Sequence, residues 1–283
     1  ERQDARAVLD GTESAWIQEV NSIAFEEQWH TARHLANSYH YSSADALLTV
    51  IKQQGIPSTS PLASRVQTLS TLCRGFDAWD RFDHVEAQRL LQSQGAYASK
   101  PLLDDLRELV KSANADYSPE QWAASSVMPV YDLLRNAERR AAQGRYDDAV
   151  ARCYRAVELL AQNRLLAVFG IKSNNVDPGL AQEWLREQPE RARRIPIKAG
   201  LEEDYAILLS KQDPLGLTFE KHHKSLQEML RRRNASILAH GTKPIRKEEW
   251  PGLYQPVVDF LAAAIGAIGL KMRLPVQFPA LDL

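Results

Sequence analysis

The sequence is poor in the residues that mark several common classes of protein. Its 283 residues include two cysteines, Cys73 and Cys153, which are too few for a disulfide framework or a cysteine-rich zinc module and which suit a reducing cytoplasm. No stretch contains the roughly 18–20 uncharged apolar residues that a membrane helix requires. The most apolar segment, residues 260–270, is short and interrupted by glycine, so we expect it to form a buried core helix.

A large excess of charge of one sign is also missing. The chain carries 35 Lys and Arg against 36 Asp and Glu, so it is not a uniformly basic protein that coats nucleic acid. The charges are unevenly distributed, with 11 basic and 16 acidic residues in 1–116 but 24 and 20 in 117–283. Eight basic residues gather in 221–250, namely Lys221, Lys224, Arg231, Arg232, Arg233, Lys243, Arg246 and Lys247. This patch indicates either a polyanion site or a solvated helix face. Composition alone favours the solvated helix face.

Strand patterns are scarce, and the periodicity of apolar residues predicts an all-α fold. Apolar residues recur at steps of three and four among good helix formers. The predicted helices cover residues 13–38, 43–54, 61–79, 82–94, 101–113, 118–143, 145–169, 179–187, 200–211, 219–240 and 253–272. Ser118-Pro119 predicts a helix start, and Gly144, Gly170 and Gly241 predict helix ends.

The small polar stretch 112–119 separates the two charge regimes and predicts a domain boundary. We expect a helical-hairpin scaffold over residues 1–116 and a second helical domain over residues 117–283. An aromatic residue followed by small residues recurs at Tyr41, Phe82 and Tyr146, but the spacings of 41 and 64 residues give no fixed repeat. Close crossings of antiparallel helices explain this pattern more simply.

Most motifs of enzyme chemistry are absent. The sequence contains no GxGxxG, no phosphate-binding GK[ST] loop, no GxSxG and no HExxH. His30 and His34 lie four residues apart on a predicted helix, but a metal site needs a third ligand that the neighbourhood lacks. Cys73 and Cys153 lie within helical patterns as small core residues. We therefore expect neither a metal nor a cofactor.

The segment 229–241 carries the best candidate for chemistry. Seven residues turn a helix through about 700°, so Arg233 and His240 share one face at about 10 Å along the axis. Gly241 fits the left-handed position past the helix end. A His that exchanges protons, with Arg233 and Asn234 stabilising phosphate charge, is suited to phosphodiester chemistry. The alternative, a surface Arg and a capping His, stays open, because Arg33 and His40 repeat the spacing in the acidic half.

Arg233-Asn234-x5-His240-Gly241 resembles the signature of the HEPN (higher eukaryotes and prokaryotes nucleotide-binding) ribonucleases. Residues 131–140 and 144–160 resemble the paired helices that precede the catalytic helix in CRISPR-associated CARF–HEPN ribonucleases of type III systems. The resemblance covers residues 117–283 and, more loosely, the region around Trp79. No βαβ pattern of a CARF domain is present, so activation by cyclic oligoadenylate would require a domain absent from this sequence.

The resemblance implies a HEPN-type helical bundle, a homodimer with a composite cleft, and metal-independent cleavage of single-stranded RNA that leaves a 2′,3′-cyclic phosphate, in cytoplasmic antiviral defence. It assigns His240 as acid and base, Arg233 as the stabiliser of phosphate charge and Asn234 as a positioning group. RNA-binding roles would fall to the nearby cations Arg231, Arg232, Lys221 and Lys224.

Tyr154, Arg155 and Glu158 share one face of a predicted helix and either brace this site or form an ordinary Arg155–Glu158 ion pair. Two other functions stay open besides an endoribonuclease. One is a non-catalytic HEPN-like binding module, such as an antitoxin or a scaffold. The other is a helical adaptor in which the basic patch is incidental.

Overall fold

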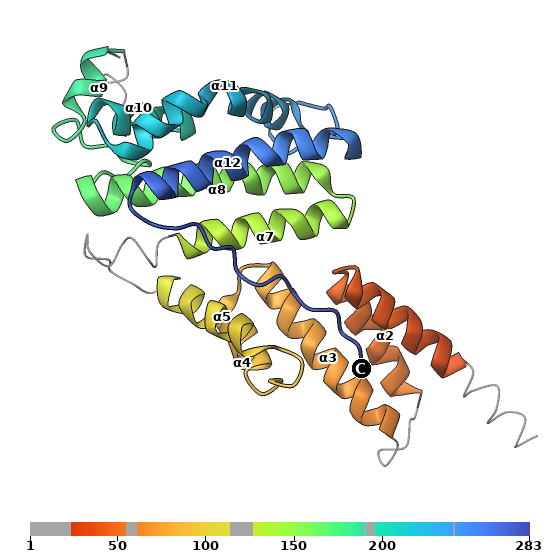
Figure 1. The fold of residues 1–283 in the computed structure, drawn as a ribbon. Coiled ribbons are helices and arrows are strands. Elements are labelled where there is room, and N and C mark those ends of the chain that lie inside the picture. Colours follow the sequence, from red (N-terminus) through yellow and green to blue (C-terminus); the bar gives the residue numbers. More distant parts are fainter. Residues whose placement is uncertain (1–23, 55–60, 114–126, 188, 191–195, 240) are drawn as a thin grey trace, which may run out of the picture. The chain divides into compact units, whose positions relative to one another are not determined.

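The chain is helical throughout the residues that the computed structural model describes, which are 24–54, 61–113, 127–187, 189–190, 196–239 and 241–283 (Figure 1). Within these ranges there is no strand, only an isolated bridge between Lys172 and Asn175. The all-α prediction is therefore confirmed. The chain forms two compact units, one of residues 1–103 with 278–283 and the other of residues 104–277.

The first unit is built from helices that pack against neighbours in the sequence. A helical stretch, 24–37, precedes α2 (Tyr41–Gln53), α3 (Pro61–Asp80) and α4 (His84–Leu91), and α3 packs against both α2 and α4. A Cβ on Gly75 would lie 2.6 Å from Leu91 Cδ2, so glycine permits the close approach of α3 and α4. Helix α5 (Lys100–Ala113) continues from this unit into the second.

The last residues of the chain complete the core of the first unit. The ring centroid of Phe278 lies 4.8 Å from that of Phe76, 5.0 Å from that of Trp79 and 6.1 Å from that of Tyr41. Leu281 is also buried, and its backbone N–H donates to Asn37 Oδ1 at 2.7 Å. The sequence alone did not indicate this return of the tail.

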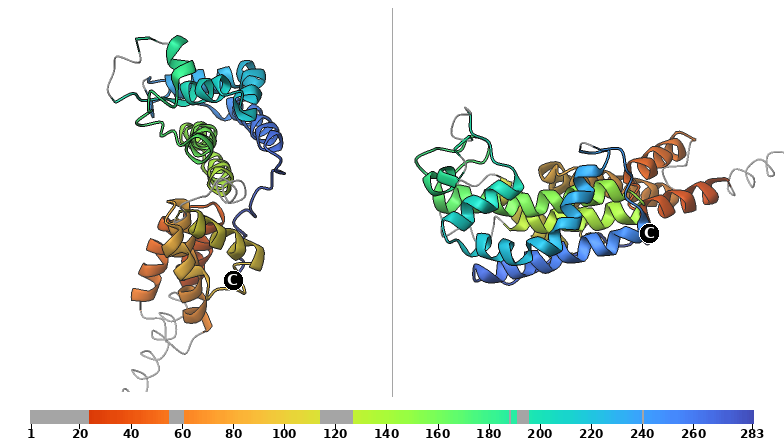
Figure 2. Two further views of the ribbon diagram at one scale, coloured as in Figure 1. Left: turned by 90° about the vertical axis from the view of Figure 1, so that its left-hand side faces the viewer. Right: turned by 90° about the horizontal axis from the view of Figure 1, so that it is seen from above.

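Helix α8 is the centre of the second unit. It packs against α7, α10, α11 and α12 (Figure 2). The helices of this unit beyond α5 are α7 (Met128–Ala142), α8 (Tyr146–Phe169), α9 (Gln182–Glu187), α10 (Leu201–Ser210), α11 (Pro214–Ala235), the 3₁₀ turn η2 (Lys247–Glu249) and α12 (Trp250–Ala267).

Stacked aromatic rings join three of these helices. Tyr205 of α10 and Phe219 of α11 stack at 4.0 Å between centroids, and Phe260 of α12 meets both edge-on at 5.7 Å. Gly216 lets α10 and α11 approach closely, since a Cβ there would lie 2.3 Å from the backbone nitrogen of Leu209. The apolar segment 260–270 was expected to form a buried core helix. One face of it is buried, through Phe260, Leu261, Ala264 and Ile265, but Gly266 and Ala267 are exposed and α12 ends at Ala267.

The predicted helix 219–240 is wrong at both ends. It begins at Pro214, because the side chain of Asp213 accepts from Leu215 N at 2.9 Å and caps a helix that has proline in its first turn. It ends at Ala235, before His240. Gly144 and Gly170 follow helix ends with positive φ angles of 74° and 67°, as predicted. The predicted start at Ser118-Pro119 lies outside the described residues.

None of the described helices combines the length and apolarity needed to cross a membrane.

Candidate functional site

Arg233 lies in the last turn of α11 and is held against α8. Its guanidinium carbon lies 4.1 Å from the centroid of the Tyr154 ring. Its Nη1 donates a hydrogen bond to Asn234 Oδ1 at 3.0 Å. A cation over an aromatic face is attracted by the ring quadrupole, so Tyr154 restricts the directions in which the charge of Arg233 can point.

Ser236 ends the helix that carries Arg233. Its backbone N–H and its Oγ both donate to the carbonyl oxygen of Arg233, at 3.1 and 2.8 Å, while its own backbone is extended. Arg233 and His240 therefore do not share a face of one continuous helix, and Gly241 is not the residue just past the helix end, so those two predictions are wrong. A short polar side chain that bonds to nearby backbone competes with helix continuation.

The chain turns back on the end of α11 after Ser236. The backbone N–H groups of Ala239 and Gly241 both donate to the carbonyl oxygen of Ser236 at 3.1 Å, and Lys243 N donates to Ala235 O at 3.1 Å. A Cβ on Gly241 would lie 2.0 Å from Ala235 O, so only glycine fits. His240 itself lies outside the described residues. Its two chain neighbours both contact the helix end that carries Arg233.

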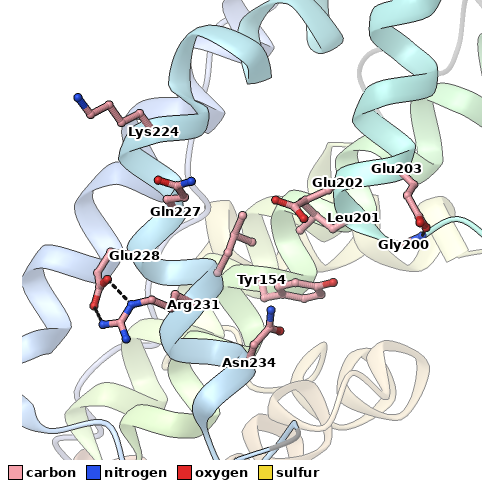
Figure 3. A pocket seen from close by; sticks show the side chains of 11 residues that line it. Tyr154, Gly200, Leu201, Glu202, Glu203, Lys224, Gln227, Glu228, Arg231 and Asn234 are labelled. Carbon is pink, nitrogen blue, oxygen red and sulfur yellow. Dashed lines mark hydrogen bonds and ion pairs between the residues drawn. The ribbon is translucent and has the colours of Figure 1, made fainter. Parts of the chain in front are cut away.

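A pocket of about 700 Å³ opens beside this helix end (Figure 3). Tyr154 of α8 forms one side, the first turn of α10 a second, and one face of α11 a third. The lining residues are Tyr154, Gly200, Leu201, Glu202, Glu203, Lys224, Gln227, Glu228, Leu230, Arg231 and Asn234. The α11 residues recur at steps of three and four, which is the spacing of one helix face.

Most charges on the pocket wall are already paired. Arg231 donates to both carboxylate oxygens of Glu228, at 2.6 and 2.8 Å, and Glu203 accepts from Gly200 N at 2.7 Å. Glu202 Oε1 lies 3.1 Å from His223 Nε2. Lys224 is exposed, and no described residue forms an ion pair with it.

Burial controls the ionisation of Tyr154 and of Asp204, which affects the pKa of Tyr154. It raises the pKa of Tyr154, and Glu158 adds to the rise, while the charge of Arg233 and a hydrogen bond from the backbone of Leu201 partly oppose it. Tyr154 is therefore neutral in the working range of pH.

Asp204 of α10 is completely buried, and burial raises its pKa to about 7, with a further contribution from Glu158. The side chains of Ser173 and Gln162 are its nearest hydrogen-bonding groups and lower the pKa. Neither carboxyl oxygen has a partner at standard hydrogen-bond distance, so these groups offset the desolvation only in part.

The predicted RNA-binding cations occupy different environments. Lys224 and Arg231 line the pocket, and Lys221 is exposed on the same helix but outside the lining. Arg232 points elsewhere: its side chain is 12% exposed, lies 2.6 Å from Glu249 and donates to Pro244 O at 3.2 Å. Arg232 therefore ties α11 to the loop before α12.

The expected ion pair between Arg155 and Glu158 is present at 2.7 Å, and Arg155 also donates to Gln162 Oε1 at 2.7 Å. Arg33, whose spacing to His40 imitates the candidate motif, instead lies 3.2 Å from Asp282.

Among the described residues, no group of three or more His, Cys, Asp or Glu side chains is arranged to hold a metal ion. His30 lies 3.7 Å from Glu26 on the same helical stretch.

Sequence reasoning did not find the pocket. Glu202 and Gln227 lie in no motif, although the spacing of 224, 227, 231 and 234 marks a polar face of α11. The stacking of Arg233 on Tyr154 joins residues 79 positions apart, and no local pattern reports such a contact.

Two family models match the chain. One, described as the Csm6 HEPN domain, matches residues 118–264, which is more than half of the chain. The other, described as the Csm6 6H domain, matches residues 25–116. No curated protein matches.

Proposed function

Because the chain belongs to the Csm6 HEPN family, we propose that it is a CRISPR-associated endoribonuclease that cleaves single-stranded RNA without a metal ion. The observation that carries this proposal is the arrangement at the end of α11. Arg233 is fixed by Tyr154 and Asn234 at the edge of a pocket, and the chain folds back there on either side of His240.

The chemistry needs only these side chains and the RNA. The 2′-OH attacks the adjacent phosphorus, the 2′-O–P bond forms, and the P–O5′ bond breaks. The neutral imidazole of His240 accepts the proton of the attacking 2′-OH. A protonated imidazole donates a proton to the leaving 5′ oxygen. Arg233 stabilises the negative charge that builds on the phosphate, and Asn234 positions the guanidinium of Arg233. The products are a 2′,3′-cyclic phosphate and a 5′-hydroxyl.

A second copy of the chain completes the cleft in this proposal. Ile237 and Leu238 are 64% and 52% exposed in the loop directly after α11. Two large apolar side chains in water beside a polar site favour burial against a partner. A homodimer that pairs these loops would place two copies of the Arg233 helix end around one RNA strand.

The cations of α11 have different roles in this scheme. Lys221, Lys224 and Arg231 attract the RNA backbone as exposed charges. Arg232 supports the fold through Glu249 instead of meeting RNA. The proposed ribonuclease domain is 117–283, the proposed scaffold is 1–116, and activation by cyclic oligoadenylate would act through a domain outside this sequence in a cytoplasmic antiviral response.

The test is cleavage of a labelled single-stranded RNA by the purified protein in excess chelator. We expect cutting to persist in the chelator, to leave cyclic phosphate ends, and to vanish in His240→Ala with the helical content unchanged. His30→Ala is the matched control and should leave cleavage unchanged, because His30 is an exposed histidine of the first unit that lies beside Glu26. Cleavage by His240→Ala at the rate of the unchanged protein would refute the proposal. RNA binding without turnover in every form would favour the non-catalytic binding module.

A further inference from the structure

The pocket beside Arg233 has the size and lining of a site for a nucleoside. Its volume of about 700 Å³ falls within the range of roughly 300–1,000 Å³ that small-molecule sites occupy. Leu201 and Leu230 supply buried apolar surface, and Tyr154 supplies an aromatic ring. Tyr154 and Asn234 belong both to this lining and to the group around Arg233. The pocket is therefore continuous with the proposed phosphate site.

A phosphate group fits this pocket poorly. The first turn of α10 carries Glu202, Glu203 and Asp204, so acidic side chains already occupy the positive end of the helix dipole. Arg231 is neutralised by two hydrogen bonds to Glu228. The pocket favours an uncharged polar group, such as a base, over an anion.

We propose that this pocket binds the nucleobase next to the cleaved linkage and prefers a base with an exocyclic amino group over uracil. The inference rests on the proposed function and extends it to the choice of substrate. Glu202 of α10 and Gln227 of α11 point toward one another across the pocket (Figure 3). Lys224, which forms no ion pair with a described residue, lies on the same wall nearer the start of α11.

The preference follows from the donors and acceptors on the two sides. An ionised carboxylate only accepts hydrogen bonds, and His223 contacts one oxygen of Glu202, which leaves Oε2 for a ligand. Adenine, cytosine and guanine each carry an amino group that donates, whereas uracil presents a carbonyl oxygen in its place. Uracil can donate to Glu202 only through its single N3–H, and the two flanking carbonyl oxygens would then lie beside the carboxylate and weaken the contact.

The binding test uses the full chain with His240→Ala and short RNA strands that have 2′-deoxyribose at one linkage, so that no cleavage occurs. The base on each side of that linkage is varied in turn. At one position we expect the amino-bearing bases to bind about tenfold more tightly than uracil, the effect of one charge-assisted hydrogen bond. Adding Glu202→Met should reduce this difference to less than about threefold. Glu220→Met, which removes an exposed acid on α11 outside this pocket, should leave it unchanged.

The outcomes separate this inference from the proposed function. Tight RNA binding with equal affinity for all four bases, or a preference that survives Glu202→Met, would overturn the base site and leave the ribonuclease proposal intact. Failure of every strand to bind, together with no cleavage of all-ribose strands by the unchanged protein, would overturn both.

Discussion

Both units of the chain bury aromatic rings, but they differ in how many ionisable side chains lie beneath the surface of the described residues. The first buries a cluster of rings, in which Phe278 packs among Tyr41, Phe76 and Trp79. The second also stacks rings, but it buries more ionisable groups, including the carboxyl of Asp204 and the ion pair between Arg164 and Asp213 at 2.8 Å. Apolar packing stabilises a fold directly, whereas buried charge costs desolvation energy. We infer that burial of ionisable groups costs the second unit more desolvation energy than it costs the first.

Substitution of Arg233 gives the largest expected effect and belongs to the second unit. Removal of a preorganised cation that stabilises transition-state charge reduces the rate by about 10²–10³-fold. We expect Arg233→Ala to lose this much cleavage activity while the midpoint of urea unfolding hardly moves. Arg33→Ala, the imitation of the motif in the first unit, should retain full activity, because Arg33 contacts Asp282. Equal losses of cleavage activity in Arg233→Ala and Arg33→Ala would contradict the assignment of the site to the second unit alone.

Removal of the Phe278 ring tests the first unit. We expect Phe278→Ala to lower the free energy of unfolding by about 3–5 kcal/mol, because it leaves a cavity among three aromatic side chains. Val276→Ala, two residues earlier and 45% exposed, is the control and should cost well under 1 kcal/mol. The measurement is equilibrium unfolding in urea. A near-neutral Phe278→Ala would mean that the tail is not part of the core.

The buried acid Asp204 predicts a pH dependence of stability. Its pKa is about 7 in the folded chain and is near the ordinary Asp value when unfolded, so the folded state holds the extra proton between these pH values. Stability from this group is therefore complete at low pH and falls as pH rises from about 4 to about 7, by on the order of 1 kcal/mol per pH unit. Unfolding at about pH 5 and about pH 8 should show this fall.

The variant Asp204→Asn has no titrating carboxyl at this position. Its free energy of unfolding should therefore lack the decrease between about pH 4 and about pH 7 that Asp204 causes. Glu202→Gln changes an exposed acid in the same helical turn and should keep it. A fall of equal size in the unchanged protein and in Asp204→Asn would assign the pH dependence to other groups.

The smallest effect concerns the support of Arg233. A cation over an aromatic face contributes roughly 0.5–2 kcal/mol, so we expect Tyr154→Leu to reduce the cleavage rate by about tenfold. Tyr154→Phe keeps the ring and should restore most of this loss. The relevant readout is kcat with KM measured separately, since a merely destabilised chain would lose active protein without a change in KM. If Phe and Leu at this position behave alike, the stacking does not position Arg233.

Local sequence patterns predicted much of the fold. Helix periodicity indicated the all-α class, and Gly144 and Gly170 marked helix ends because their backbone adopts positive φ. The end of α11 was missed, since apolar periodicity continues through Ile237 and Leu238 while Ser236 bonds back to Arg233. The start of the same helix was also missed, although Asp213-Pro214 is a capping signal that the sequence displays.

The candidate site could be predicted from the sequence only in part. Arg233 and Asn234 could be selected by the resemblance, but their environment depends on Tyr154 and the first turn of α10, which are distant in sequence. The exposed run of cations looked uniform, yet Arg232 is enclosed by Glu249 and Pro244 whereas its neighbour Arg231 faces the pocket. Adjacent residues on a helix point about 100° apart, so composition cannot assign them one role.

The course of the chain affects how the protein can be divided. The backbone leaves the first unit at residue 103 and returns to it at residue 278, so a single proteolytic nick between the units does not release either one. The C-terminal fragment would still bind the N-terminal fragment through Phe278 and Leu281, and the two fragments should elute together from a size-exclusion column. Two cuts, or one cut combined with Phe278→Ala, would be needed to free the second unit as a separate piece.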